Sequence, residues 1–284
     1  MSAAAEPAAI LDRPVFIVAS PRSGASLLFD TLMRAPKVYS AGAASHQLLE
    51  GIDGLHVRAR GFDSNRLLAA DATPAVAAEL ARRFDAAARD RDGAPPQRLP
   101  FRLLDKTPKH SLRVPFLAQA FPDAQFVYLY RDPRQVLANM LLAWASGKFR
   151  TYAGLPGWPR DHWALLLTPG WRALAGKPLA DIVAGQWQAA TDVLLADLEA
   201  LAPQRWRVLR YDDFLANPSG EIARLCLALD YGWDRPLNGG VPTAAGEQPT
   251  AEDAEVVRRH AADLQRLWPG LQATADRAAR LAGL

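Results

Sequence analysis

A short apolar run that leads directly into a loop containing serine and glycine constrains this chain more than any other feature. Residues 15–19 (VFIVA) are β-branched or apolar, and the loop reads SPRSGAS at 20–26. The apolar positions of the next segment, LLFDTLM at 27–33, recur at helical spacing. The pattern predicts a strand, a tight loop and a helix in direct succession.

Strand and helix patterns alternate along the rest of the chain. Further strands are predicted at residues 125–130 and 206–211, and helices at 73–91, 182–200 and 221–229. Strands that alternate with helices are typical of parallel sheets covered on both faces. The sequence therefore predicts an α/β fold, with a P-loop-like, mostly parallel sheet and helices on both faces.

The chain is predicted to form one domain, residues 1–284, with one unusual segment. Residues 147–178 contain Trp158, Trp163 and Trp171 among five glycines and four prolines. This segment is too punctuated for regular structure and too aromatic for a solvated linker. It is predicted to be a tryptophan-rich insertion or lid that lines a pocket, or else an irregular segment whose tryptophans dock onto the core.

Composition excludes several classes of function. The 33 basic and 30 acidic residues give a net charge of +3 without a long run of one sign, so nucleic acid is not an expected partner. Cys226 is the single cysteine, which excludes an intramolecular disulfide and a cysteine metal cluster. The sequence shows no run of roughly 20 apolar residues and no signal-peptide pattern. We expect a cytoplasmic protein with no membrane span, and the oligomeric state stays open.

The loop after the first predicted strand has the chemistry of an anion site. Gly24 lets the backbone approach a phosphate closely, and the hydroxyls of Ser23 and Ser26 can donate hydrogen bonds. Arg22 adds a charge that can fork onto phosphate or sulfate oxygens. A nucleoside-triphosphate loop would require GxxxxGK followed by Ser or Thr, and the chain has no such segment. A small-molecule kinase or ATPase is therefore disfavoured.

Four segments resemble the motifs of the sulfotransferase family, in the order in which that family carries them. The loop PRSGASLL at 21–28 is similar to the family's 5′-phosphosulfate loop, PRSGTT or PRSGTS. DKTP at 105–108 resembles its EKTP segment, and FPDAQFVYLYRDPR at 121–134 resembles its strand and 3′-phosphate motif. RYDDFLANP at 210–218 is similar to its RYEDL segment. The resemblance is strongest to the bacterial and tyrosylprotein-type branch and implies the sulfotransferase fold.

The resemblance also implies 3′-phosphoadenosine 5′-phosphosulfate (PAPS) as co-substrate, its 3′,5′-bisphosphate PAP as product, and no metal. The residues expected to bind the 5′-phosphosulfate are Arg22, Ser23, Gly24, Ala25, Ser26 and Leu27. The 3′-phosphate is expected at Arg131 and Asn139, with Tyr211 on the other side of the nucleotide. Lys106 matches the family's electrophilic lysine, whose ammonium stabilises charge as the S–O bond breaks. The alternative for Lys106 is a surface salt bridge with Asp105, and for Arg131 it is a capping role at the end of its strand.

One departure from the family pattern concerns the base. This branch carries a glutamate base in a segment resembling GGESH, and GAASH at 42–46 has Ala44 at that position. His46 is the first candidate to replace it, with Glu50 one helical turn later to orient the imidazole. His110, close to Lys106, is the second candidate. If neither serves, the chain is a non-catalytic or repurposed member that binds an anionic nucleotide.

Other departures concern the nucleotide. Ala25 replaces a common threonine, and Asn139 replaces a serine while keeping a donor. Residues 238–250 offer no lysine or arginine to close over the nucleotide. The leading hypothesis is transfer of a sulfuryl group to a hydroxyl or amine of a small-molecule or carrier-linked acceptor. Residues 45–70 and 147–178 would set the choice of acceptor.

Overall fold

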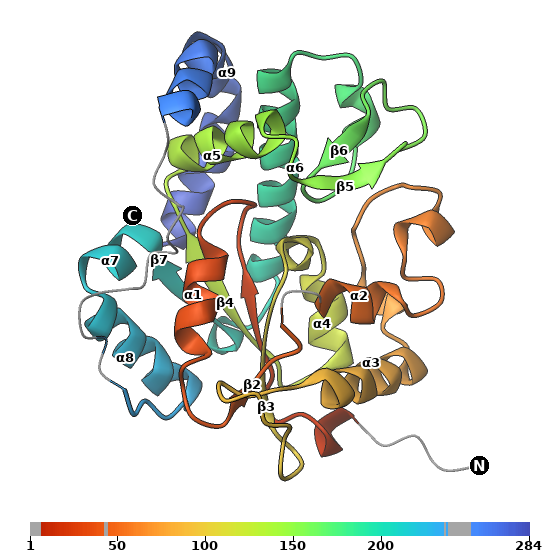
Figure 1. Cartoon of the computed structure of the whole chain (residues 1–284), viewed down its shortest axis with the longest axis vertical. Helices are drawn as coiled ribbons and strands as arrows, with labels where there is room; N and C mark the ends of the chain where they lie inside the picture. Colours follow the sequence, from red (N-terminus) through yellow and green to blue (C-terminus); the bar gives the residue numbers. More distant parts are fainter. Residues whose placement is uncertain (1–6, 43–44, 236, 238–250) are drawn as a thin grey trace.

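Five parallel strands form the central sheet (Figure 1). In the computed structural model, which describes residues 7–42, 45–235, 237 and 251–284, they lie in the order β2-β3-β1-β4-β7. Their bounds are β1 Val15–Val18, β2 Val38–Tyr39, β3 Arg102–Lys106, β4 Gln125–Tyr130 and β7 Trp206–Arg210. Every pairing in this sheet is parallel, which confirms the predicted α/β fold.

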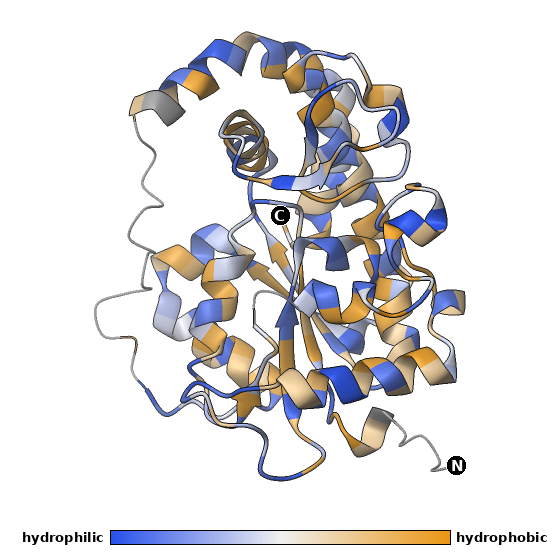
Figure 2. Cartoon of the chain, turned by 45° about the vertical axis from the view of Figure 1, so that its right-hand side comes forward, coloured by the Kyte–Doolittle hydropathy of each residue, from blue (hydrophilic) through white to orange (hydrophobic). Residues whose placement is uncertain are grey.

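Alternation of side chains along the strands gives the sheet two buried faces. Phe16 and Val18 of β1 face one core, while Val15 and Ile17 face the other. The first core is covered by α3 (Pro74–Ala87), α4 (Val114–Ala120) and the C-terminal part of α6 (Leu179–Glu199). The second is covered by α1 (Ala25–Leu32) and α8 (Pro218–Leu229). Figure 2 shows the apolar strands enclosed between these helices, so helices lie on both faces as predicted.

Helices α5 (Pro133–Ala145), α6 and α9 (Ala251–Leu281) lie around the upper end of the sheet in Figure 1. Side chains of these three helices share a third core. The shorter elements are α2 Ser45–Glu50, α7 Tyr211–Ala216, η1 Pro7–Ala9, η2 Val57–Arg60, η3 Ala69–Asp71, η4 Pro108–Leu112, η5 Trp171–Leu174 and η6 Pro203–Arg205. Within the described ranges, no helix combines the length and the apolar character needed to cross a membrane.

Residues 147–178 contain more regular structure than the sequence predicts. Strands β5 (Arg150–Ala153) and β6 (His162–Ala164) pair in antiparallel fashion, so the expectation of irregular structure was wrong there. Trp158, Trp163 and Trp171 are buried, and the ring centroids of Trp158 and Trp163 are 4.8 Å apart. The tryptophans therefore dock onto the core, while residues 148–154 of the same segment line a cavity.

The start of α5 is fixed by a cap that also places a candidate site residue. The Asp132 carboxylate accepts hydrogen bonds from the backbone N–H groups of Arg134 at 2.9 Å and Gln135 at 3.1 Å. Pro133 occupies the first helical position, where no backbone donor is required. Arg131 is thereby held between the end of β4 and the first turn of α5.

Candidate active site

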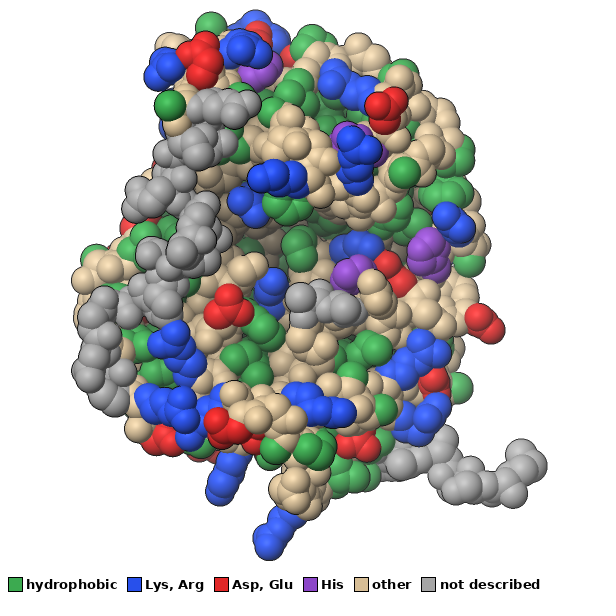
Figure 3. Space-filling model, in the orientation of Figure 1, with side chains coloured by type: hydrophobic (Ala, Val, Ile, Leu, Met, Phe, Trp, Pro, Cys, Tyr) green, Lys and Arg blue, Asp and Glu red, His purple; other side chains and the backbone are tan. Residues whose placement is uncertain are grey.

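A cavity of about 1170 Å³ opens at the carboxyl ends of β1, β3 and β4. The loops that follow these strands form one part of its wall, and α2, η2 and residues 148–154 form another. Figure 3 shows this face of the molecule hollowed, with Lys, Arg and His side chains around the hollow. The carboxyl edge of a parallel sheet is where α/β proteins usually bind their ligands.

The loop between β1 and α1 turns sharply into the helix. Arg22 and Gly24 have φ values of 66° and 93°, and Gly24 is the N-cap residue of α1. The ring of Tyr211 lies so close that a Cβ on Gly24 would be 2.2 Å from its Cε2 atom. The N–H groups of Ala25 and Ser26 precede the first intrahelical acceptor, whereas the Leu27 N–H already donates to the Gly24 carbonyl. The helix dipole adds partial positive charge at this end. This arrangement is a cradle for an anion.

Lys106 extends from the end of β3 toward that cradle. Its Nζ donates a hydrogen bond to Ser26 Oγ at 3.0 Å. Burial lowers the pKa of Lys106, and the charges of Asp30 and Asp105 act in the opposite direction. The alternative salt bridge is absent, because Asp105 Oδ2 lies 2.7 Å from His110 Nε2. Successive strand residues point to opposite faces, so Lys106 reaches the cavity while Asp105 is buried.

Three other expected nucleotide ligands line the same cavity. The Arg131 guanidinium lies 4.2 Å from the centroid of the Tyr211 ring, and its Nε donates to Gln135 Oε1 at 2.9 Å. Asn139 Nδ2 donates to the Arg22 carbonyl at 3.4 Å. Arg131, Asn139 and Tyr211 thus come together with the β1–α1 loop, although they follow two different strands.

Three of the expected site residues do not line the cavity. Ser23 is buried and its N–H donates to the Ser20 carbonyl at 3.3 Å, while the Leu27 N–H donates to the Gly24 carbonyl at 3.0 Å. His110 is 1% exposed and is held against Asp105. A base must reach the acceptor, so the geometry removes His110 from the candidates.

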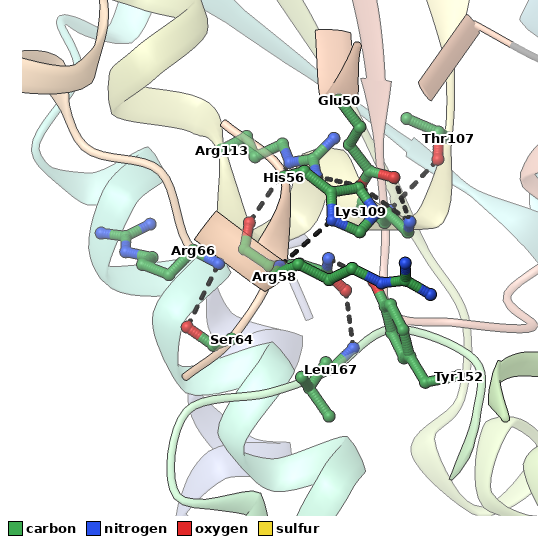
Figure 4. A network of polar contacts seen from close by, with 11 residues as sticks. Glu50, His56, Arg58, Ser64, Arg66, Thr107, Lys109, Arg113, Tyr152 and Leu167 are labelled. Atoms are coloured by element: carbon green, nitrogen blue, oxygen red, sulfur yellow. Dashed lines mark hydrogen bonds and ion pairs between the residues drawn. The ribbon is translucent and has the colours of Figure 1, made fainter. Parts of the chain in front are cut away.

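His46 lines the cavity from α2. Burial lowers the pKa of His46, and the nearby charge of Lys109 lowers it further, which keeps the imidazole neutral and able to accept a proton. Glu50 does not orient it as expected. The Glu50 carboxylate accepts hydrogen bonds from Lys109 Nζ at 2.7 and 2.8 Å and from Arg113 Nη2 at 2.5 Å (Figure 4). Ala44 and residues 238–250 lie outside the described residues.

The cluster of Glu50, Lys109 and Arg113 was missed by sequence reasoning. Burial alone would raise the pKa of Glu50, but the charges of Arg113 and Lys109 outweigh that effect and lower it. Arg113 is fully buried and also donates to the Asn65 carbonyl at 3.2 Å. Glu50 is separated from Lys109 by 59 positions, so no local spacing could reveal the pair.

Metal ligands are not gathered here. In the described part of the chain, no group of three or more His, Cys, Asp and Glu side chains is placed to hold a metal ion.

Comparison with known proteins matches residues 14–235 to the model of the sulfotransferase family. The chain belongs to the sulfotransferase family. The matched range contains each of the site residues discussed above, from Arg22 to Tyr211.

This chain matches curated relatives over part of its length. It is 28% identical over 127 residues to the omega-hydroxy-beta-dihydromenaquinone-9 sulfotransferase Stf3 of Mycobacterium bovis, and 29% identical over 137 residues to the nodulation protein NoeE of Sinorhizobium fredii. Each match covers 45% of this chain but only 28% of the relative's length. A sulfotransferase structure from Alicyclobacillus acidocaldarius has a TM-score of 0.51 at 14% identity, covering 96% of this chain and 97% of the other, which shows the shared fold alone.

Proposed function

We propose that this sulfotransferase uses PAPS to transfer a sulfuryl group to a hydroxyl or amine of a small-molecule or carrier-linked acceptor. One observation carries the proposal: Lys106 Nζ lies 3.0 Å from Ser26 Oγ, at the helix start where the anion cradle forms. An ammonium beside the cradle is positioned to stabilise charge that develops on an oxygen bound there.

The donors that line the cavity fit PAPS. The N–H groups of Ala25 and Ser26 at the start of α1, together with the side chains of Arg22 and Ser26, would hold the phosphosulfate. Arg131 and Asn139 would hold the 3′-phosphate, where a guanidinium can fork onto phosphate oxygens. The close approach of Tyr211 to Gly24 leaves no room for a side chain at the cradle, which supports a site shaped for direct backbone contact.

The residues would divide the reaction between them. The acceptor atom forms a bond to sulfur while the bond from sulfur to the 5′-phosphate oxygen breaks, and that oxygen takes the electron pair. Lys106 stabilises the resulting negative charge. His46 takes the proton that the acceptor loses, a role for which its lowered pKa leaves it unprotonated at neutral pH.

A second candidate is a non-catalytic or repurposed member that binds an anionic nucleotide. The observation that favours it is the engagement of Glu50 by both Lys109 and Arg113. Glu50 is the one carboxylate among the described residues that line the cavity, so none is left to replace the glutamate missing at position 44.

Calorimetric titration with PAP tests the nucleotide site. PAP should bind about 10- to 100-fold more tightly than adenosine 5′-phosphate, because charge-assisted contacts to the 3′-phosphate contribute about 1.5–3 kcal/mol. Equal affinities would contradict the proposal. Turnover on a panel of phenols, alcohols and amines then separates the two candidates. Transfer that appears only in Ala44→Glu would support the non-catalytic alternative.

A further inference from the structure

The wall of the cavity contains more lysines and arginines than the proposed nucleotide site requires. Among the described lining residues there are seven lysines and arginines: Arg22, Arg58, Lys106, Lys109, Arg131, Lys148 and Arg150. Glu50 is the one carboxylate among the same residues. The proposed nucleotide site accounts for Arg22, Lys106 and Arg131, so four cations remain for the rest of the cavity.

Arg58 is the most informative of these four cations. It belongs to η2, and its backbone N–H donates to His56 Nδ1 at 3.1 Å. Its guanidinium makes no hydrogen bond or ion pair with any residue that the structure describes. Figure 4 shows the Arg58 side chain pointing into the space toward which Lys109 and Tyr152 also turn. Arg58 is exposed, so its five guanidinium donors are open to solvent and free to bind an anion that enters this side of the cavity.

The neighbouring cluster does not neutralise this charge. Glu50 contributes one negative charge, while Lys109 and Arg113, both bonded to it, contribute two positive charges. At His46, burial has the largest effect and lowers the pKa, the charge of Lys109 lowers it further, and the charge of Glu50 raises it. An anion placed near Arg58 would meet a positive potential from both sources.

Apolar side chains border the same part of the cavity. Phe62 of the segment after η2, Tyr152 of β5, and Leu165 and Leu166 after β6 all line it. The Lys109 Nζ lies 5.3 Å from the centroid of the Tyr152 ring, which joins the charged and apolar parts of the wall. A ligand that matches this wall has an apolar body and an anionic group.

We propose that the acceptor carries an anionic group, a carboxylate or a phosphate, that binds Arg58 on the side of the cavity formed by η2 and Lys109. Its apolar body packs on Phe62, Tyr152 and Leu165, with the reacting hydroxyl or amine directed toward Lys106. The inference rests on the proposed function, because an acceptor exists only if the cavity serves transfer. It narrows the acceptor class to anionic molecules.

The test compares acceptors that differ only in charge. para-Hydroxyphenylacetate and ω-hydroxydodecanoate are titrated beside their methyl esters, and the two acids differ in the distance between hydroxyl and carboxylate. Each titration uses PAP-saturated protein and protein alone. Phosphonates with the same apolar bodies are titrated as well, which shows whether the site prefers a phosphate-like group or a carboxylate. Each anion should bind about 10- to 100-fold more tightly than its neutral ester.

Variants of Arg58 assign the preference to one residue. Arg58→Gln should bring the anion and the ester to within a few-fold of each other, and Arg58→Glu should favour tyramine over para-hydroxyphenylacetate. Arg60→Gln is the matched control, because Arg60 lies on the same turn but pairs with Asp71 and does not line the cavity. It should keep the preference of the parent.

The outcomes separate this inference from the proposed function. Equal affinities for anion and ester in the parent, failure of every anion to bind, or a preference that survives in Arg58→Gln would each overturn the inference. If PAP does not bind, the proposed function fails, and the comparison with protein alone still decides whether Arg58 recognises an anion.

Discussion

Replacement of Gly24 by alanine should damage the cradle through two separable effects. Gly24 has a φ of +93°, a conformation in which a Cβ atom introduces strain. The new Cβ would also lie 2.2 Å from Tyr211 Cε2 and 2.7 Å from Cδ2, far inside van der Waals contact. The ring would have to move, and Arg131 lies 4.2 Å from its centroid.

The size of each effect follows from these contacts. The left-handed backbone should lower the free energy of unfolding by about 1–2 kcal/mol. Displacement of the Tyr211 ring and Arg131 should remove a charge-assisted contact to the 3′-phosphate, which is about 1.5–3 kcal/mol of binding free energy. PAP affinity should therefore fall about 10- to 100-fold.

A matched glycine isolates the clash. Gly170 has a φ of +73°, and nothing lies within 4 Å of a Cβ built on it. Gly170→Ala should lose similar stability in urea unfolding and bind PAP like the parent in calorimetry. In a Tyr211→Ala background, Gly24→Ala should weaken PAP binding less, because the obstructing ring is gone. Unchanged PAP affinity in Gly24→Ala would refute the reasoning.

Three further predictions concern the ionisable residues of the site. Arg131→Ala should weaken PAP about 10- to 100-fold in calorimetry and leave adenosine 5′-phosphate nearly unaffected. Glu50→Gln should lower the free energy of unfolding by about 3–5 kcal/mol, because Arg113 would stay buried without its carboxylate. Glu79→Gln, on a surface pair, should lower it much less. His46→Ala should lower turnover about 10²–10⁴-fold at unchanged PAP affinity.

The shifted pKa values give two of these predictions a pH dependence. The folded protein lowers the pKa of Glu50, so its stabilisation is complete above the unfolded-state pKa and is lost as the pH falls through the folded-state pKa. The stability gap between parent and Glu50→Gln should therefore narrow in acid. The lowered pKa of His46 should keep turnover constant down to below about pH 6.5.

Each of these predictions has a contrary result. Equal losses for PAP and adenosine 5′-phosphate in Arg131→Ala would show that this residue does not read the 3′-phosphate. A Glu50→Gln loss no larger than that of Glu79→Gln would contradict the role of the buried cluster. Turnover in His46→Ala within a few-fold of the parent would leave the base unassigned.

Local patterns predicted the elements that carry the nucleotide loop. The strand at 15–18, the helix at 25–32 and the strand at 125–130 follow from apolar runs and turn residues that act over a few positions. Strand β3 was missed, because RLLDK is short and charged at three of five positions. The strand order that brings β3 beside β1 depends on pairings between distant segments, which no local pattern encodes.

In the site too, some residues could be predicted from the sequence and others depend on contacts between distant segments. Arg22, Lys106, Arg131 and Tyr211 reach one cavity as the family resemblance implied. The partners of Glu50 and the burial of His110 could not be predicted, because each depends on which face of an element meets a distant neighbour. Residue type alone allows either His110 or His46 to act as a base. Only the direction of the side chain, which is buried for His110 and faces the cavity for His46, distinguishes the two.

The most direct measurement of the central claim follows radiolabelled sulfur from PAPS to an acceptor, in the parent and in Lys106→Ala, beside the PAP affinity of each. We predict a labelled product with the parent, a rate at least about 10²-fold lower with Lys106→Ala, and PAP affinities within a few-fold of each other. Equal rates for the two proteins, or PAP binding by the parent without labelled product from any acceptor, would contradict the account.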